Sequence, residues 1–588
     1  MDFAKKSFRE LFEAWFVQFR IPEYQRAFEW DTNEKRKRNQ VKEFWEDLQE
    51  FMDSTSAFPL GNIIVLKERG EGNYYIVDGQ QRITTSLILI KSIADRIKEL
   101  GYNEIANDQL KKVYIVFQEK DQRRIKFLPQ EYDANFWENF IIRGENSVIP
   151  ETPSQKRIKD AKEFFDKQLK DLSFDEINKI RDKIENSTVV VITLSDKKEA
   201  SSIFELQNDR GKTLSNLDKI KAFFIHQISI CNGNEEDISF IYREFRDIYK
   251  ILNSENFLKE DDVLLYHIQA HTELAYDYRE LSQLKDRIKN KEPRERIEYI
   301  KTFSSELSRS YKAIQTFLED SQEIACYLKD LEKFKFAFAY PFIIKAYKFF
   351  AEDKTKLYKF LGYLEKVIFI HNLVSTRAEI DSRLNEFLKK FDKNIDIDSF
   401  FYGIFKKLAD EGYWKDSVAR NISSGYMYTD LAKYILKRYE IHLRENHKEG
   451  FAGNLRCINV FKKDKNNGTE WWIEHIAPET ENIEENNGYE HYDEDFINNY
   501  LNSIGNLLLT TNKHNISLGN RAFAQKLDSY KQSPMYHHRE IETFAENGRW
   551  TKNSIRKRTE TLVEFILDTW GLERSIKRME SEGIKPRA

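Results

Sequence analysis

The stretch from Trp471 to Pro478 limits the local fold to a short strand that ends at a bend. It reads Trp-Trp-Ile-Glu-His-Ile-Ala-Pro. Neighbouring side chains of a strand point to opposite faces, but near a bend both Glu474 and His475 can reach one ion or water. Pro478 stops the strand because proline cannot donate a hydrogen bond to a strand ladder. The pattern therefore predicts a strand that presents an acidic residue and a histidine at its end.

Two asparagines follow this strand, Asn506 directly after a glycine and Asn515 nine residues later. The Glu-His-Ile-x-Pro start and this separation resemble the HNH, or ββα-metal, nuclease motif. The resemblance implies that His475 is the catalytic base and that Asn506 completes the catalytic set by orienting it. It assigns Glu474 and Asn515 as ligands of a metal ion. The alternative interpretation is an ordinary surface pair followed by an ordinary turn.

The chemistry of phosphodiester cleavage explains why these residue types occur together. The attacking water needs a base, and a neutral histidine accepts a proton near pH 7. The developing phosphorane needs positive charge, which one hard divalent cation held by oxygen ligands supplies. We therefore expect Mg²⁺ or Mn²⁺ as the cofactor. The three cysteines are far apart, which argues against a zinc site and against disulfides: Cys231, Cys326 and Cys457.

The segments beside this motif differ in charge. Residues 479–495 carry eight acidic residues, which repel a DNA backbone, so we expect this insert to face away from DNA or to act as a gate. Basic residues follow, and they are candidates for contacts to DNA: Lys526, Arg549 and Arg556. A solvated helix face is the alternative for the basic residues near the C-terminus.

A second chemical signal lies between a strand and a helix in the N-terminal third. Residues 61–66 and 74–77 read as buried strands, and a helix with apolar residues at helical spacing begins after residue 82. The start of a helix offers backbone N–H groups and a positive dipole end to phosphate. A plain Asp-Gly turn is the alternative. The nucleotide-binding candidates are Asp78, Gly79, Gln80, Gln81 and Arg82.

Three segments together resemble signatures of the GmrSD-type restriction family: residues 21–26, 78–82 and 203–218. In that family these signatures belong to a ParB/sulfiredoxin-like domain that binds and hydrolyses nucleoside triphosphates. The resemblance therefore implies a nucleoside triphosphate as a ligand of this chain. It also adds three residues to the nucleotide-binding candidates: Gln25, Arg26 and Asn208.

The organisation of the chain follows from periodicity. From residue 219 to 438 the apolar spacing is helical almost throughout, without a fixed repeat. We expect an α+β multidomain protein: a ParB-like α/β domain at 1–225, a helical connector at 226–435 and an HNH domain at 436–588. Within the first domain we expect strands at 113–118 and 188–194 and helices at 153–169 and 174–186.

Bulk properties set limits on these domains. The chain has 588 residues and a net charge of −4, so a DNA-binding surface has to be local. Apolar residues make up 40% and charged residues 33%, which is typical of a globular chain with a sizeable core. We find no signal peptide and no apolar run long enough to span a membrane, and we expect a cytoplasmic protein without a membrane partner.

These features favour a nucleotide-regulated, modification-dependent DNA endonuclease of anti-phage defence, which cuts or nicks DNA. The expected partners are double-stranded, modified phage DNA and a nucleoside triphosphate, and the chain is a candidate homo-oligomer. Two alternatives stay open. One is an HNH nuclease that acts on RNA, and the other is a ParB-like, nucleotide-switched DNA-binding protein whose HNH fold is inactive.

Overall fold

The computed structural model describes the following residues: 2–14, 16–32, 39–67, 72–119, 122–194, 215–254, 257–271, 280–374, 379–411, 427, 429–446, 471–483, 486–511 and 518–584. The chain divides into two compact units, Met1–Gln315 and Thr316–Ala588, which we call the N-terminal and C-terminal units. The expected helical connector, residues 226–435, spans this division. In the described part of the chain, no helix is long and apolar enough to cross a membrane.

A mixed six-stranded sheet organises the N-terminal unit, in the order β1-β8-β3-β4-β2-β7. Its strands are β1 (Asp2–Ser7), β2 (Gln18–Arg20), β3 (Pro59–Lys67), β4 (Asn73–Asp78), β7 (Phe127–Leu128) and β8 (Thr188–Leu194). The β3 strand runs parallel to β8 and antiparallel to β4, whereas β2 runs parallel to both β4 and β7. A separate ribbon pairs β5 (Val116–Glu119) with β6 (Gln122–Ile125). The strands predicted at 61–66, 74–77 and 188–194 are confirmed as β3, β4 and β8.

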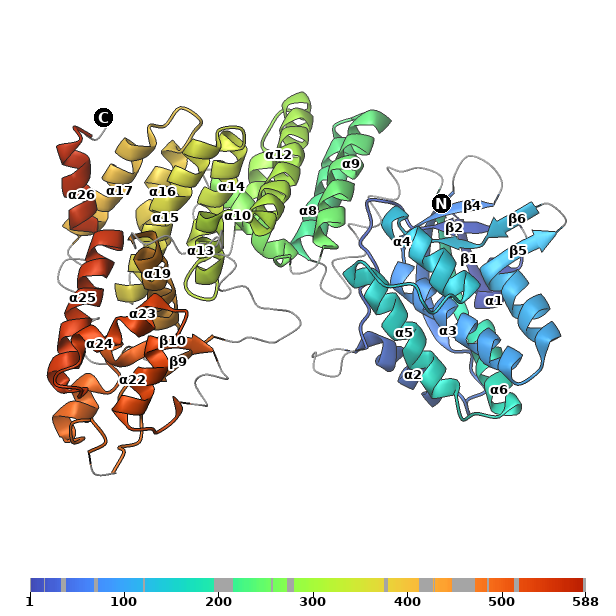
Figure 1. Cartoon of the computed structure of the whole chain (residues 1–588). Coiled ribbons are helices and arrows are strands. Elements are labelled where there is room, and N and C mark those ends of the chain that lie inside the picture. The colour runs from blue at the N-terminus through green and yellow to red at the C-terminus, as the bar shows by residue number, and fades with distance from the viewer. Residues whose placement is uncertain are drawn as a thin grey trace. The chain divides into compact units, whose positions relative to one another are not determined.

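Helices lie beside this sheet and bury its apolar face (Figure 1). They are α1 (Phe8–Phe12), α2 (Gln40–Glu50), α3 (Gln80–Glu99), η1 (Ile105–Ile115), α4 (Glu131–Phe136), η2 (Trp137–Arg143), α5 (Pro153–Leu169) and α6 (Phe174–Glu185). Helix α5 begins with a proline after a Thr152 cap, and α6 begins with a capping box, both of which are strong start signals. The helices predicted at 153–169 and 174–186 are confirmed.

The strand predicted at 113–118 is wrong over its first half. Residues Ile105–Ile115 form the helix η1, and only Val116–Glu119 form a strand. The run Val-Tyr-Ile-Val has high strand propensity, but Leu110 and Tyr114 are both fully buried one helical turn apart. Tertiary packing of that helical face therefore outweighs the local propensity.

Helices fill the described part of the middle of the chain, as predicted. In the N-terminal unit they include α8 (Asn216–Ile230), α9 (Glu235–Leu252), α10 (Glu260–His271), α11 (Glu280–Lys289) and most of α12 (Pro293–Glu319). In the C-terminal unit they are α13 (Glu323–Leu331), η3 (Ala337–Ala339), α14 (Tyr340–Phe350), α15 (Lys354–Val374), α16 (Ile380–Lys390), α17 (Ile397–Asp410) and α19 (Asp430–Asn446). Dense aromatic contacts join several of them, as the periodicity indicates.

The C-terminal unit also contains a two-stranded antiparallel ribbon, β9 (Trp471–His475) with β10 (Leu507–Thr511). Short and long helices surround the ribbon: η4 (Phe496–Tyr500), η5 (Ile504–Asn506), α22 (Phe523–Lys531), α23 (Tyr536–Arg539), α24 (Ile541–Phe544), α25 (Lys552–Trp570) and α26 (Leu572–Ser581). Figure 1 shows β9 and β10 next to α22, α23 and α19. A small core around Ile476, Phe523 and Trp550 closes this region.

Candidate functional site

The β9–β10 ribbon brings the two halves of the predicted nuclease motif together. In its register His475 pairs with Leu507, and Glu474 pairs with Leu508. Strand β9 ends at His475, three residues before Pro478, so the predicted strand is confirmed. Asn506 immediately precedes β10 and therefore lies beside the end of β9.

His475 is buried and has a defined hydrogen bond. Its Nε2 lies 3.0 Å from Oδ1 of Asn502. Because an amide oxygen only accepts, the neutral ring carries its hydrogen on Nε2, and Nδ1 is the basic nitrogen. Burial lowers the pKa of the imidazole below its ordinary value of 6.5, so the ring is neutral near pH 7. This is the protonation state that a catalytic base requires.

Glu474 forms a buried ion pair with Lys526. The ammonium donates to Oε1 of Glu474 at 2.6 Å and to the carbonyl oxygen of His475 at 2.8 Å. Burial raises the pKa of the Glu474 carboxyl and lowers that of the Lys526 ammonium, and their mutual attraction opposes both shifts. Lys526 is 0% exposed, so the prediction that it contacts DNA is wrong: its charge is used inside the protein.

Asn506 fixes the main chain that follows His475. Its Oδ1 accepts hydrogen bonds from the Ala477 amide and the Trp550 indole, each at 2.9 Å. Its Nδ2 donates to the carbonyl oxygens of Ala477 at 3.0 Å and Leu501 at 2.8 Å. The side chain is fully buried with both ends of the amide engaged. It is therefore positioned to orient the chain after the histidine, as the motif implies.

Two predicted ligands lie outside the described residues, so the structure gives no account of them: Asn515 and Asn208. Among the residues that are described, no group of three or more His, Cys, Asp or Glu side chains could hold a metal ion. The oxygen donor next to His475 is Glu474, and a carboxylate is a ligand that Mg²⁺ and Mn²⁺ prefer.

The basic residues near the C-terminus divide into exposed and buried positions. Arg549 is exposed and donates to the Tyr489 carbonyl at 3.0 Å, and Arg556 is exposed at the start of α25. Lys552 bridges two carboxylates of the acidic insert, Asp493 and Asp495, at 2.8 Å each. Arg549 and Arg556 thus remain available as DNA-contact candidates, while part of the acidic insert pairs with the protein itself.

Two residues support the ribbon without belonging to the motif. Asn502 contacts His475, and no pattern in the sequence marks it. Arg558 is fully buried and donates to the carbonyl oxygens of Gly505 at 2.9 Å and Leu507 at 2.8 Å. Its spacing from Ile555 and Leu562 places it on the apolar face of α25, a signal that was available in the sequence.

In the N-terminal unit, the turn between β4 and α3 has the predicted geometry. Gly79 caps α3 in the left-handed region with φ of 92°. A side chain at this position would bring its Cβ within 3.0 Å of Ile63. Asp78 and Arg82 lie 3.6 Å apart, with 42% and 29% of their side chains exposed. Both groups are therefore accessible at the start of a 20-residue helix.

The turn also forms hydrogen bonds with the segment at residues 25–29. Gln81 accepts from the Glu29 amide at 2.8 Å and donates to the Ala27 carbonyl at 3.0 Å. Gln25 donates to the Val77 carbonyl at 2.9 Å. Gln80 begins α3 and is partly buried. The structure thus joins two of the three signature segments, and it assigns Gln25 and Gln81 to protein contacts.

Arg26 lies in the first signature segment, residues 21–26, and connects it to the end of the third, residues 203–218. Its guanidinium lies 2.5 Å from Asp218 and 2.8 Å from Glu260, and it also contacts Ser215. Arg26 and Glu260 line a cavity of about 640 Å³ that also includes Arg157. Two carboxylates therefore already neutralise this arginine, and a phosphate at Arg26 would have to compete with them.

The comparisons with known proteins match both regions. Residues 8–225 match the family model of the GmrSD restriction endonuclease N-terminal domain, which contains the Asp78–Arg82 turn. Residues 407–565 match the family model of the GmrSD restriction endonuclease C-terminal domain, which contains the β9–β10 ribbon. No curated protein matches the chain.

Proposed function

This chain belongs to the GmrSD restriction endonuclease family, and we propose that it cleaves DNA at the β9–β10 ribbon by an HNH-type, metal-dependent mechanism. The observation that carries the proposal is the geometry at the end of β9: the ring of His475 is held by Asn502, and the main chain that follows it is fixed by Asn506. Such a ring accepts the proton of an attacking water.

The metal ion of this mechanism is Mg²⁺ or Mn²⁺, with Glu474 and Asn515 as its proposed protein ligands. The donor chemistry fits, because both residues offer oxygen atoms and hard divalent cations prefer oxygen. The ion, when bound, supplies positive charge to the phosphate. Residues of the chain supply the rest: His475 takes the proton, Asn502 holds its ring, and Asn506 holds the chain that follows it.

We also propose that the N-terminal unit binds and hydrolyses a nucleoside triphosphate at the start of α3. Asp78 and Arg82 are partly exposed there, and Gly79 permits a close approach of phosphate to the backbone. Arg82 offers a planar donor for phosphate oxygens. We further propose that cleavage depends on a modification of the DNA and on the nucleotide state, as in defence against phage.

One observation favours a second candidate function. Lys526 already occupies an oxygen of Glu474, a proposed metal ligand, with its ammonium at 2.6 Å. A ribbon held in this state would lack part of its metal site. The chain would then be a nucleotide-switched DNA-binding protein that does not cut.

Incubation of the protein with plasmid and phage DNA of differing modification, with Mg²⁺ or Mn²⁺ and with each nucleoside triphosphate in turn, tests these proposals. We expect cleavage that needs the metal ion and fails in His475→Ala. Binding of DNA without cleavage under every condition would favour the second candidate. Cleavage of RNA but not of DNA would assign the nuclease to a different substrate.

A further inference from the structure

The outer edge of strand β10 is capped by two histidines rather than by a third strand. The Nε2 of His537 lies 3.2 Å from the amide nitrogen and 3.1 Å from the carbonyl oxygen of Leu509. The Nε2 of His538 lies 3.0 Å from the same carbonyl oxygen. A two-stranded ribbon leaves the backbone groups of its outer edges without a strand partner, and imidazole nitrogens can replace one.

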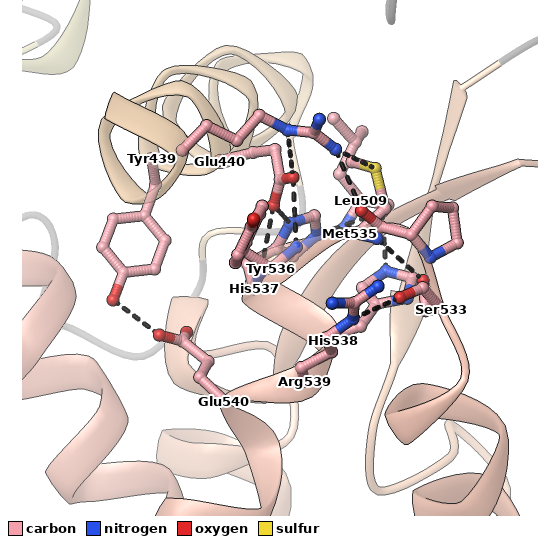
Figure 2. A network of polar contacts seen from close by, with 12 residues as sticks. Tyr439, Glu440, Leu509, Ser533, Met535, Tyr536, His537, His538, Arg539 and Glu540 are labelled. Atoms are coloured by element: carbon pink, nitrogen blue, oxygen red, sulfur yellow. Dashed lines mark hydrogen bonds and ion pairs between the residues drawn. The ribbon is translucent and has the colours of Figure 1, made fainter. Parts of the chain in front are cut away.

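Glu440 holds His537 in this place. It comes from α19, 97 residues earlier in the chain, and it is 0% exposed. Its carboxylate accepts from His537 Nδ1 at 2.7 Å and from the amides of Tyr536 and His537 at 3.0 Å each. It also accepts from Nε of Arg444 at 2.6 Å. Figure 2 shows these contacts converging on the carboxylate from α19 on one side and α23 on the other.

The ionised carboxylate of Glu440 requires a hydrogen on Nδ1 of His537. Burial alone would raise the pKa of Glu440, but its hydrogen bonds to His537 and to backbone amides lower the pKa overall. A carboxylate accepts only, so Nδ1 of His537 is the donor to it. Nε2 of the same ring is thereby directed at the backbone of Leu509, so the carboxylate sets the orientation of the ring against β10.

Leu509, which the two histidines contact, lies close to Glu474 and His475 in the ribbon. Leu509 is two residues from Leu507, which pairs with His475, and it is adjacent to Leu508, which pairs with Glu474. The ribbon has only two strands, so β9 has β10 as its sole strand partner among the described residues. A shift of β10 along its axis would therefore shift the ends of both strands, where Asn506 and His475 lie.

We propose that Glu440 is a positioning residue for the cleavage reaction: through His537 it fixes β10, and through β10 it fixes the end of β9. This inference rests on the proposed nuclease function of His475. A buried ionic network contributes little net stability compared with apolar packing, and the role that we infer for this one is to hold the ribbon in a single geometry. Displacement of a catalytic group by about 1 Å can reduce a rate about a hundredfold.

Glu440→Gln tests the inference, with Glu365→Gln as its matched control. Glu365 is also a buried carboxylate, 2% exposed, and it accepts from the Trp570 indole at 2.9 Å and from the Tyr434 hydroxyl on the same helix α19. The readouts are the single-turnover cleavage rate, the Kd for DNA and the Tm. The cleavage rate of each variant is measured well below its own Tm.

We expect Glu440→Gln to lower the cleavage rate by about tenfold to a hundredfold, with the Kd for DNA unchanged within about twofold. We expect both variants to lower the Tm by similar amounts. Glu365→Gln should nevertheless keep the cleavage rate of the wild type within about twofold. Equal rates in the two variants, after allowance for stability, would overturn the inference. If Glu440→Gln does not fold, His537→Gln takes its place, because it keeps Glu440 with its backbone donors.

Failure of this inference is distinguishable from failure of the nuclease proposal. If wild type and His475→Ala cut DNA equally well, the nuclease proposal fails, whatever Glu440→Gln does. If His475→Ala is inactive and Glu440→Gln cuts like wild type, only the positioning role is wrong.

Discussion

The protonation state of His475 decides how cleavage depends on pH. Burial keeps the pKa of the imidazole below 6.5, so the neutral base persists to a lower pH than an exposed histidine would. We expect the cleavage rate to fall only below pH 6.5, and His475→Ala to reduce it about 10²–10⁴-fold at neutral pH. His491, an exposed partner of Glu481 in the same region, is the control, and His491→Ala should cut like wild type. Full activity in His475→Ala would remove this residue from the mechanism.

The buried pair of Glu474 and Lys526 makes a prediction about stability. Lys526→Met leaves the Glu474 carboxylate buried without its cation, and the loss of one partner from a buried pair costs about 3–5 kcal/mol. We expect a lower urea midpoint for Lys526→Met, and partial recovery in the double variant Glu474→Gln/Lys526→Met. A midpoint equal to that of wild type would mean that the pair does not exist in solution.

At the scale of secondary-structure elements, local patterns predicted the chain where one interaction dominates. The strand before Pro478, the helix after Gly79 and the capped helices α5 and α6 all follow from short-range signals. The helix at Ile105–Ile115 did not, because burial of Leu110 and Tyr114 outweighs the β propensity of the sequence.

The candidate site shows the same limit. His475 and Asn506 belong to a motif of fixed spacing, so the sequence indicates both of them. The contacts of Asn502, Lys526 and Glu440 span 27, 52 and 97 residues, and nothing in a single sequence states which side chains meet over such distances. Burial reversed the interpretation of Lys526 in particular, since a lysine near a DNA-binding motif resembles a surface residue until its environment is known.

The start of helix α3 allows a controlled test of its glycine. Gly79 and Gly101 lie at opposite ends of this helix with φ values of 92° and 93°, so alanine strains the backbone equally at both, by about 1–2 kcal/mol. Only at Gly79 would the new Cβ meet a neighbour, Ile63 at 3.0 Å, whereas nothing lies within 4 Å at Gly101. We expect Gly79→Ala to be the less stable variant and to bind nucleoside triphosphate more weakly, as measured by thermal unfolding and nucleotide titration. Equal nucleotide affinity in both variants would argue against phosphate binding at this turn.

At the scale of the whole molecule, the two proposed activities belong to different units. The Asp78–Arg82 turn lies in the N-terminal unit and His475 lies in the C-terminal unit. A nuclease without control would damage the DNA of its own cell, so we propose that the nucleotide state of the first unit controls cleavage by the second. If a nucleoside triphosphate changes the affinity for DNA, DNA must change the affinity for the nucleotide by the same factor.

This reciprocity makes the control testable with one variant. We expect DNA that carries the recognised modification to change the rate of nucleotide hydrolysis, and unmodified DNA to leave it unchanged. Arg82→Ala removes a partly exposed guanidinium beside Asp78 and should weaken nucleotide binding, since Arg82 is the proposed donor to phosphate. Because Arg82 and His475 belong to different units, an altered DNA-cleavage rate in this variant would have to be transmitted between them. Nucleotide hydrolysis that ignores DNA, together with normal cleavage by Arg82→Ala, would show that the two units act independently.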